Sequence, residues 1–258
     1  MHAAHYFRLI DTMARMALRA DSSKYFLGYI WWILEPLLYV GVFYVVFSVI
    51  LDARREDFLM FLMCGKLAFI WFSKSVIQGA NSIVANSGLI GKINVPKTLF
   101  PLAVIQEGLY KQAAVFLLLF VVLYVYGYPP TATWAWLLAV IAVNYLMIVA
   151  CALVGACMVC LVRDFSLLIS LGMTFLLFTS GVFWDVRSLG DPQMTELVLD
   201  VNPLAFMLDA YRQILMYHTA PDGGHLFLVA LVFGALALCM VYLMHSASQF
   251  LALRALSS

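Results

Sequence analysis

Long apolar runs limit the fold of this chain more than any other feature of its sequence. A helix needs about 20 residues to cross the ~30 Å hydrocarbon core of a bilayer. Six runs are long enough, at residues 27–51, 58–80, 100–126, 134–162, 165–184 and 225–245. Hydrophobic residues make up 65% of the chain and charged residues 11%, whereas soluble domains hold roughly 45–50% and 25%. The sequence therefore predicts an all-α integral membrane protein with six transmembrane helices.

Residues 1–26 precede the first run and follow a different pattern. Apolar residues recur there at helical spacing, with Arg8 and Arg15 between them. The pattern predicts an amphipathic helix that lies in the membrane interface, with its arginines toward lipid phosphates. An ordinary helix packed on the bundle is the alternative. Residues 27–258 would then form a single transmembrane domain.

Positive charges in the connections set the expected orientation, because cytoplasmic loops of membrane proteins are richer in Lys and Arg. With the N-terminus inside, the inner segments hold eight of these residues and the outer segments four. The eight are Arg8, Arg15, Arg19, Lys24, Lys92, Lys97, Arg163 and Arg254, and the four are Arg54, Arg55, Arg187 and Arg212. The bias predicts that both termini lie in the cytoplasm.

Two connections are too apolar to be simple linkers. Residues 81–95 are rich in Ile, Leu and Val but are broken by glycine, so we expect a short amphipathic helix at the cytoplasmic surface, available to a partner. Residues 186–217 contain an apolar helical stretch that is too short to cross a membrane, which takes about 20 residues. We expect two short re-entrant external helices there, separated near Asn202 and Pro203.

Ionisable residues within spans are functional candidates, because a charge inside the membrane is costly. At about 1.5 Å per residue, Glu35, Lys74 and Glu107 lie roughly 9–12 Å from the cytoplasmic ends of their spans. Lys111 is one turn beyond Glu107, a spacing that allows an ion pair on one helix. We expect these four residues to form an intramembrane charged cluster. The cluster either neutralises itself and fixes helix packing, or lines a polar route near the cytoplasmic entrance.

Aromatic residues are concentrated on the first and fifth predicted spans. Aromatic faces contact the C–H groups of sugars without requiring a fixed hydrogen-bond pattern, which would suit a long sliding polymer. Lipid contact or helix packing is the alternative for each of them. The candidates for an aromatic channel lining are Trp32, Tyr39, Phe43, Phe47, Phe175 and Phe178.

Motifs of enzymes and metal sites are missing from the sequence. Gly91 and Lys92 are followed by Ile93 and do not complete a phosphate-binding loop. HExxH and GxSxG do not occur. Cys157 and Cys160 have CxxC spacing but lie in an apolar run without a second pair, so buried thiols are expected. We expect no catalytic residue and no metal, and the net charge of +1 gives no indication of nucleic-acid binding.

Four motifs, taken in order, resemble the membrane subunit (permease) of type-2 ABC exporters, in the branch that exports polysaccharides such as O-antigen. LGYIWWILEP at 27–36 is the most specific of them. It is followed by GKLAFIWFSKSV at 65–76, IGKINVPKTLFP at 90–101 and VNPLAFMLDAYR at 201–212. Lys66 departs from the uncharged residue common in that family. The resemblance covers nearly the whole chain and lies in the succession of motifs.

The resemblance implies partners and a substrate. Two copies of the chain would bind two separately encoded ATP-binding subunits, which would hold ATP and Mg²⁺, while this chain would hold no cofactor. The complex would lie among the lipids of the bacterial inner membrane and export a lipid-linked polysaccharide, with O-antigen favoured over capsular polysaccharide or teichoic acid. ATPase coupling is implied for Ser82, Asn86, Leu89, Ile90 and Lys92, and an external gate for Asn202, Pro203 and Arg212.

Two other functions remain open from the sequence. An ABC permease for a drug or small lipid would have the same spans. A membrane-embedded transferase acting on lipid-linked sugars would need acidic residues on outer loops, where Asp185, Asp191 and Asp200 occur without an evident site.

Overall fold

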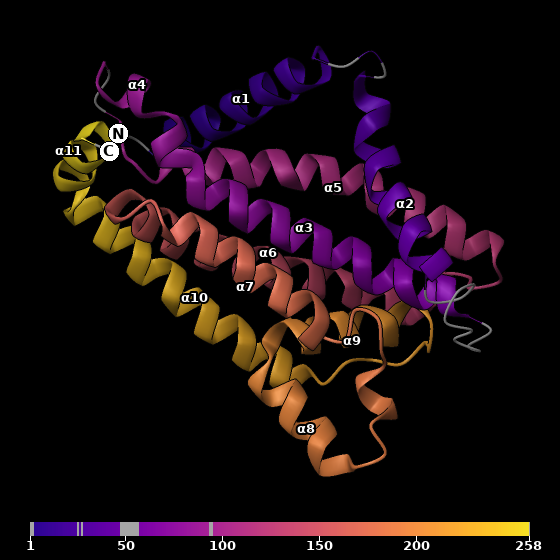
Figure 1. Ribbon diagram of the computed structural model, residues 1–258. Coiled ribbons are helices and arrows are strands. Elements are labelled where there is room, and N and C mark those ends of the chain that lie inside the picture. The colour runs from indigo at the N-terminus through magenta and orange to yellow at the C-terminus, as the bar shows by residue number, and fades with distance from the viewer. Residues whose placement is uncertain (1–2, 25, 27, 47–56, 93–94, 258) are drawn as a thin grey trace.

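The computed structural model describes residues 3–24, 26, 28–46, 57–92 and 95–257. Within these ranges all regular structure is helical. Figure 1 shows a bundle of long helices with α1 lying across one side of it. The long members of the bundle are α3 (Phe58–Ala85), α5 (Leu99–Val125), α6 (Trp136–Leu161) and α10 (Gly223–Ser246).

Four helices are long and apolar enough to cross a membrane: α3, α5, α10, and α6 together with the 3₁₀ turn before it, Ala132–Leu161. They correspond to four of the six predicted spans. The first predicted span is described as α2 (Trp31–Tyr44), and its residues 47–51 lie outside the described part of the chain. The fifth is α7 (Phe165–Thr179), which is apolar but only 15 residues long. Four of the six expected spans therefore coincide with helices that are long and apolar enough to cross a membrane, and the six-span arrangement stays a prediction.

Helix α3 is the centre of the bundle. In the apolar 18-residue stretch of α3, 83% of the residues are buried. In the corresponding stretch of the peripheral α10, 17% are buried. Small residues let α3 approach α6 closely. A Cβ at Gly79 would lie 2.8 Å from the Cβ of Ala152, and a Cβ at Gly155 would lie 2.7 Å from that of Ala80. The packing of the two helices therefore depends on the absence of side chains at these glycines.

Helix α1 (Ala3–Ser22) packs along α5, and its expected position in the membrane interface stays a prediction. Ile10 and Ala14 of α1 are buried. The hydroxyl of Tyr6 hydrogen-bonds that of Thr98 at 2.7 Å. Apolar side chains elsewhere on α1 remain exposed, among them Phe7.

The bundle has two distinct ends (Figure 1). Helices α4 (Ser87–Ile90) and α11 (Ser248–Ser257) and both chain termini lie at one end, which we call the α4 end. A small apolar core there contains Ile90, Cys160, Met244 and Leu251. Helices α8 (Pro192–Val201) and α9 (Pro203–Leu215) lie at the opposite end, which we call the α9 end.

The helices at the α9 end begin at caps that are visible in the sequence. Asn202 accepts hydrogen bonds from the backbone N–H groups of Leu204 and Ala205, and Pro203 occupies the first turn of α9. Asp191 and Asp222 cap α8 and α10 in the same way. Such residues satisfy the N–H groups that a helix start leaves without partners. The predicted break at Asn202 and Pro203 is confirmed.

Candidate functional site

A cavity of about 420 Å³ lies among α1, α2, α3 and α5. Its lining combines charged, amide and aromatic side chains, and we call it the polar cavity. The residues that line it are Asp21, Trp31, Trp32, Glu35, Pro36, Ile70, Trp71, Lys74, Ser75, Gln78, Gly108, Lys111, Gln112 and Val115.

Ion pairs bring the four expected charged residues together around this cavity. Lys74 on α3 lies 2.7 Å from Glu35 on α2. Lys111 on α5 lies 2.8 Å from Glu107, one turn earlier on the same helix. Lys111 also pairs with Asp21 at 2.6 Å. Each lysine is thus held by a carboxylate: the Glu35–Lys74 pair links α2 to α3, and the Asp21–Lys111 pair links α1 to α5.

Asp21 is a member of the cavity that the sequence did not indicate. It lies at the end of α1, accepts a hydrogen bond from the indole N–H of Trp32, and binds Lys111. Burial raises the pKa of Asp21, but the hydrogen bond and charge of Lys111 outweigh that effect and hold the pKa below its ordinary value. Trp32, one of the aromatic residues expected to line a channel, lines this cavity.

A second, smaller cavity of about 200 Å³ lies where α2, α3 and α7 meet. Tyr39 lines it from α2 and Met173 and Thr174 from α7, and Lys66 reaches it from α3. The ammonium of Lys66 lies 4.5 Å from the centre of the Phe43 ring, and the aromatic rings of Phe69 and Phe183 also surround it. Aromatic faces attract a cation in this arrangement.

The expected channel aromatics differ in exposure. Phe175 and Phe178 on α7 and Tyr39 on α2 have exposed side chains. Phe43 is half-buried against Phe183, with ring centres 4.6 Å apart. Phe47 lies outside the described residues. The exposed aromatic residues of α2 and α7 therefore lie on the surface of this chain, where a second molecule could cover them.

The segment expected to contact an ATPase, residues 81–95, does not form one continuous helix. Helix α3 continues to Ala85, and the helix is interrupted at Asn86. Only Ser87–Ile90 then forms the separate helix α4. Ser82 is buried and donates to the carbonyl of Gly79, and Ile90 is buried in the small core. These two residues therefore stabilise the segment and do not face outward.

The surface of the same segment is formed by other residues that the sequence singled out. Leu89 and Lys92 are exposed, and Asn86 is half-buried and donates to the carbonyl of Ser82. A short apolar and basic surface is thus presented at the α4 end.

Arg212 of α9 is fully enclosed by protein. Its guanidinium donates to the backbone carbonyls of Phe61, Gly181 and Val182 at 3.3, 2.7 and 3.0 Å. It also lies 3.5 Å from the centre of the Phe61 ring. Arg212 therefore fixes α9 to the start of α3 and to the turn that follows α7. Asn202 adds a second link to that turn, because its amide donates to the hydroxyl of Ser180 at 3.0 Å.

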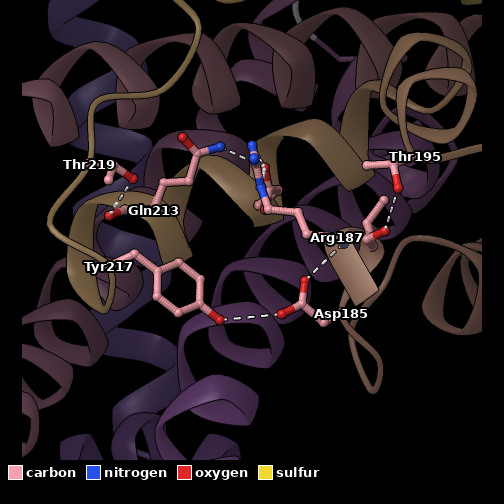
Figure 2. A network of polar contacts seen from close by, with 8 residues as sticks. Asp185, Arg187, Thr195, Gln213, Tyr217 and Thr219 are labelled. Atoms are coloured by element: carbon pink, nitrogen blue, oxygen red, sulfur yellow. Dashed lines mark hydrogen bonds and ion pairs between the residues drawn. The ribbon is translucent and has the colours of Figure 1, made fainter. Parts of the chain in front are cut away.

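A polar network ties α9 to the preceding loop (Figure 2). The buried carboxylate of Asp209 accepts from both Nε and Nη2 of Arg187, and from the amide of Gln213 at 2.6 Å. Asp185 accepts from the backbone N–H of Arg187 and from the hydroxyl of Tyr217, as Figure 2 shows. The hydrogen bond with Asp209 raises the pKa of Arg187. Neither member of this pair is among the site residues that the sequence predicts.

The chain is similar to a known protein family and to several named proteins. The profile described as "ABC-2 type transporter" matches residues 12–216. A Klebsiella pneumoniae protein named O-antigen export system permease protein RfbA is 25% identical over 217 residues, which are 83% of each chain. The Myxococcus xanthus protein of that name is 27% identical over 227 residues, 88% of this chain and 87% of the relative. Polysialic acid transport protein KpsM of Escherichia coli is 27% identical over 122 residues, 46% of each chain.

Proposed function

The chain belongs to the ABC-2 type transporter family, and we propose that it is the membrane-spanning subunit of an ATP-driven exporter of a lipid-linked polysaccharide. O-antigen is the proposed substrate. The observation that carries this proposal is the similarity over more than four fifths of the chain to permeases named for O-antigen export. The relative named for polysialic acid transport matches only 46% of the chain, so capsule export is the second candidate.

Energy would come from a partner. Two separately encoded subunits would bind and hydrolyse ATP with Mg²⁺, and this chain would bind neither. The exposed Leu89 and Lys92 at the α4 end suit the contact with that subunit. This assignment places the α4 end and both termini in the cytoplasm, and the α9 end at the periplasmic face of the inner membrane.

The route would be completed by a second copy of the chain. Tyr39 on α2 and Phe175 and Phe178 on α7 are exposed on one molecule, and two such surfaces facing each other would enclose an aromatic channel. The polar cavity, with its pairs of Lys74 and Lys111, would lie beside the cytoplasmic entrance. Helices α8 and α9, held by Arg212 and the Arg187–Asp209 pair, would close the periplasmic exit.

Deletion of the gene tests the proposal. In the deletion strain the polymer should accumulate in the cytoplasm on its lipid carrier and disappear from the cell surface, and the wild-type gene should restore it. Immunolabelling of intact and permeabilised cells measures the two pools. Loss of O-antigen with capsule retained selects the first candidate, and the reverse selects the second. Normal surface display of both polymers would reject export of either by this chain.

A further inference from the structure

Two buried N–H donors in the polar cavity have no hydrogen-bond partner among the described residues. They are Nε1 of Trp71 on α3 and Nε2 of Gln112 on α5. The side chains are only 3% and 5% exposed. The indole of Trp71 is held edge-on against Phe116, with ring centres 5.8 Å apart. Both residues line the same cavity, and the ring contact with Phe116 holds the indole of Trp71 in position.

Leaving such donors without partners is unfavourable. A buried polar group without a partner costs about 1–3 kcal/mol, and low dielectric surroundings increase the effect. A chain that keeps two of them at one cavity gains from a group that enters the cavity and accepts from both. The donors thus indicate a ligand with acceptor atoms.

The remaining lining limits the chemistry of that ligand. The ionisable groups of the cavity are two carboxylates, Asp21 and Glu35, and two ammonium groups, Lys74 and Lys111. Each lysine is already ion-paired with one of these carboxylates, at 2.7 and 2.6 Å. Lys111 is also paired with Glu107 at 2.8 Å, so the carboxylates of this group outnumber its lysines and an anion such as a phosphate is disfavoured. Each carboxylate already has an ammonium partner, so none of them requires a free cation.

A neutral sugar ring satisfies all of these features. Its hydroxyl oxygens accept from Trp71 and Gln112, its O–H groups donate to Glu35, and its C–H faces suit the aromatic surface of Trp31 and Trp32. The volume of about 420 Å³ also lies in the usual range of small-ligand pockets, about 300–1,000 Å³.

We propose that the polar cavity binds one neutral sugar unit of the transported polymer, with Trp71 and Gln112 as its hydrogen-bond donors. The inference rests on the proposed function, since it takes the ligand to be part of the exported polysaccharide. It adds a binding site lined by residues of one protomer, which shares Ile70 and Lys74 with the cavity at Tyr39.

The test measures binding to the purified complex of this chain with its ATP-binding partner in lipid nanodiscs. The probe is the set of oligosaccharides that mild acid releases from the surface polysaccharide of the host strain, titrated by calorimetry. Trp71→Phe and Gln112→Met each remove one donor and keep an apolar body. One hydrogen bond is worth about 0.5–1.5 kcal/mol, so each variant should bind about 2- to 12-fold more weakly.

Trp134→Phe is the matched control. The indole N–H of Trp134 is also buried without a partner among the described residues, but Trp134 does not line the polar cavity. This variant loses the same atoms as Trp71→Phe and should bind the oligosaccharides as wild type does. Gln112→Met should unfold at the wild-type temperature or above it, because it removes a donor without a partner.

The outcomes separate this inference from the proposed function. Weaker binding in both cavity variants, with Trp134→Phe unchanged, supports the sugar site. Wild-type affinity in both cavity variants overturns the inference, and so does a loss of co-purified phospholipid in them without a change in oligosaccharide affinity. In both cases polymer trapped in the deletion strain would leave the export proposal standing. Normal surface polymer in the deletion strain would reject the export proposal, and the inference with it.

Discussion

At the scale of single residues, Arg212 depends on a glycine that faces it. A Cβ at Gly65 would lie 2.2 Å from Nη2 of Arg212 and 2.9 Å from its Cζ. The guanidinium cannot retreat without losing its bonds to the carbonyls of Phe61, Gly181 and Val182. Gly65 is therefore required for the position of Arg212.

Gly65→Ala should displace the guanidinium and destabilise the α9 end. Overpacking of a well-packed interior costs about 1–3 kcal/mol, so the unfolding temperature of the purified protein should fall. Gly172→Ala in α7 is the control, because a Cβ there meets nothing within 4 Å. Equal unfolding temperatures for the two variants would show that Gly65 has no such role.

The sequence identified some of these residues and not others, for a physical reason. Glu35, Lys74, Glu107 and Lys111 stood out because charges are rare in apolar runs. Arg212 was expected in a gate, but its partners are backbone carbonyls, which no sequence pattern marks. Trp71 and Gln112 could not be singled out either, because the lack of a partner is a property of the folded chain.

At the scale of elements, the Glu35–Lys74 pair joins α2 to α3 across the polar cavity. Lys74→Glu should reduce export, because it sets two carboxylates against each other where an ion pair was. Adding Glu35→Lys should restore much of the lost export by reversing the pair. Surface polymer per cell measures both. Failure of the second change to rescue the first would contradict a role for the pair.

The Arg187–Asp209 pair joins the loop before α8 to α9, and its carboxylate is 3% exposed. Asp209→Asn should lower the unfolding temperature because Arg187 loses its partner. Adding Arg187→Gln should lower the unfolding temperature little further. The effects of substitutions within one network are not additive, and their coupling energy is about 0.5–3 kcal/mol. A double-mutant cycle on thermal unfolding measures this. Additive losses would indicate that the two side chains act independently.

Element boundaries followed the sequence where local chemistry decides them. The Asn202–Pro203 cap and the four long apolar helices were predictable. The segment over 81–95 was expected as one helix, but continuation of α3 to Ala85 leaves only a four-residue α4. Helix α11 was not expected, because its burial depends on Leu251 meeting a core to which α3, α4, α5, α6 and α10 all contribute.

At the scale of the whole molecule, the two ends of the bundle carry different features. The α4 end presents a short exposed segment beside both termini, and the α9 end carries short helices locked by Arg212. The central α3 passes both the polar cavity and the cavity at Tyr39 on its way between them. This polarity is what a transporter with an ATPase at one end and a gate at the other requires.

Transport in inverted inner-membrane vesicles tests this account most directly. Vesicles containing the chain and its ATP-binding partner expose the cytoplasmic face, so the labelled lipid-linked polymer starts outside. ATP with Mg²⁺ should move it into the lumen, where it resists an added glycosidase, and vesicles from the deletion strain should show no such protection. Protection that does not depend on ATP, or that is equal in the deletion vesicles, would contradict the central claim.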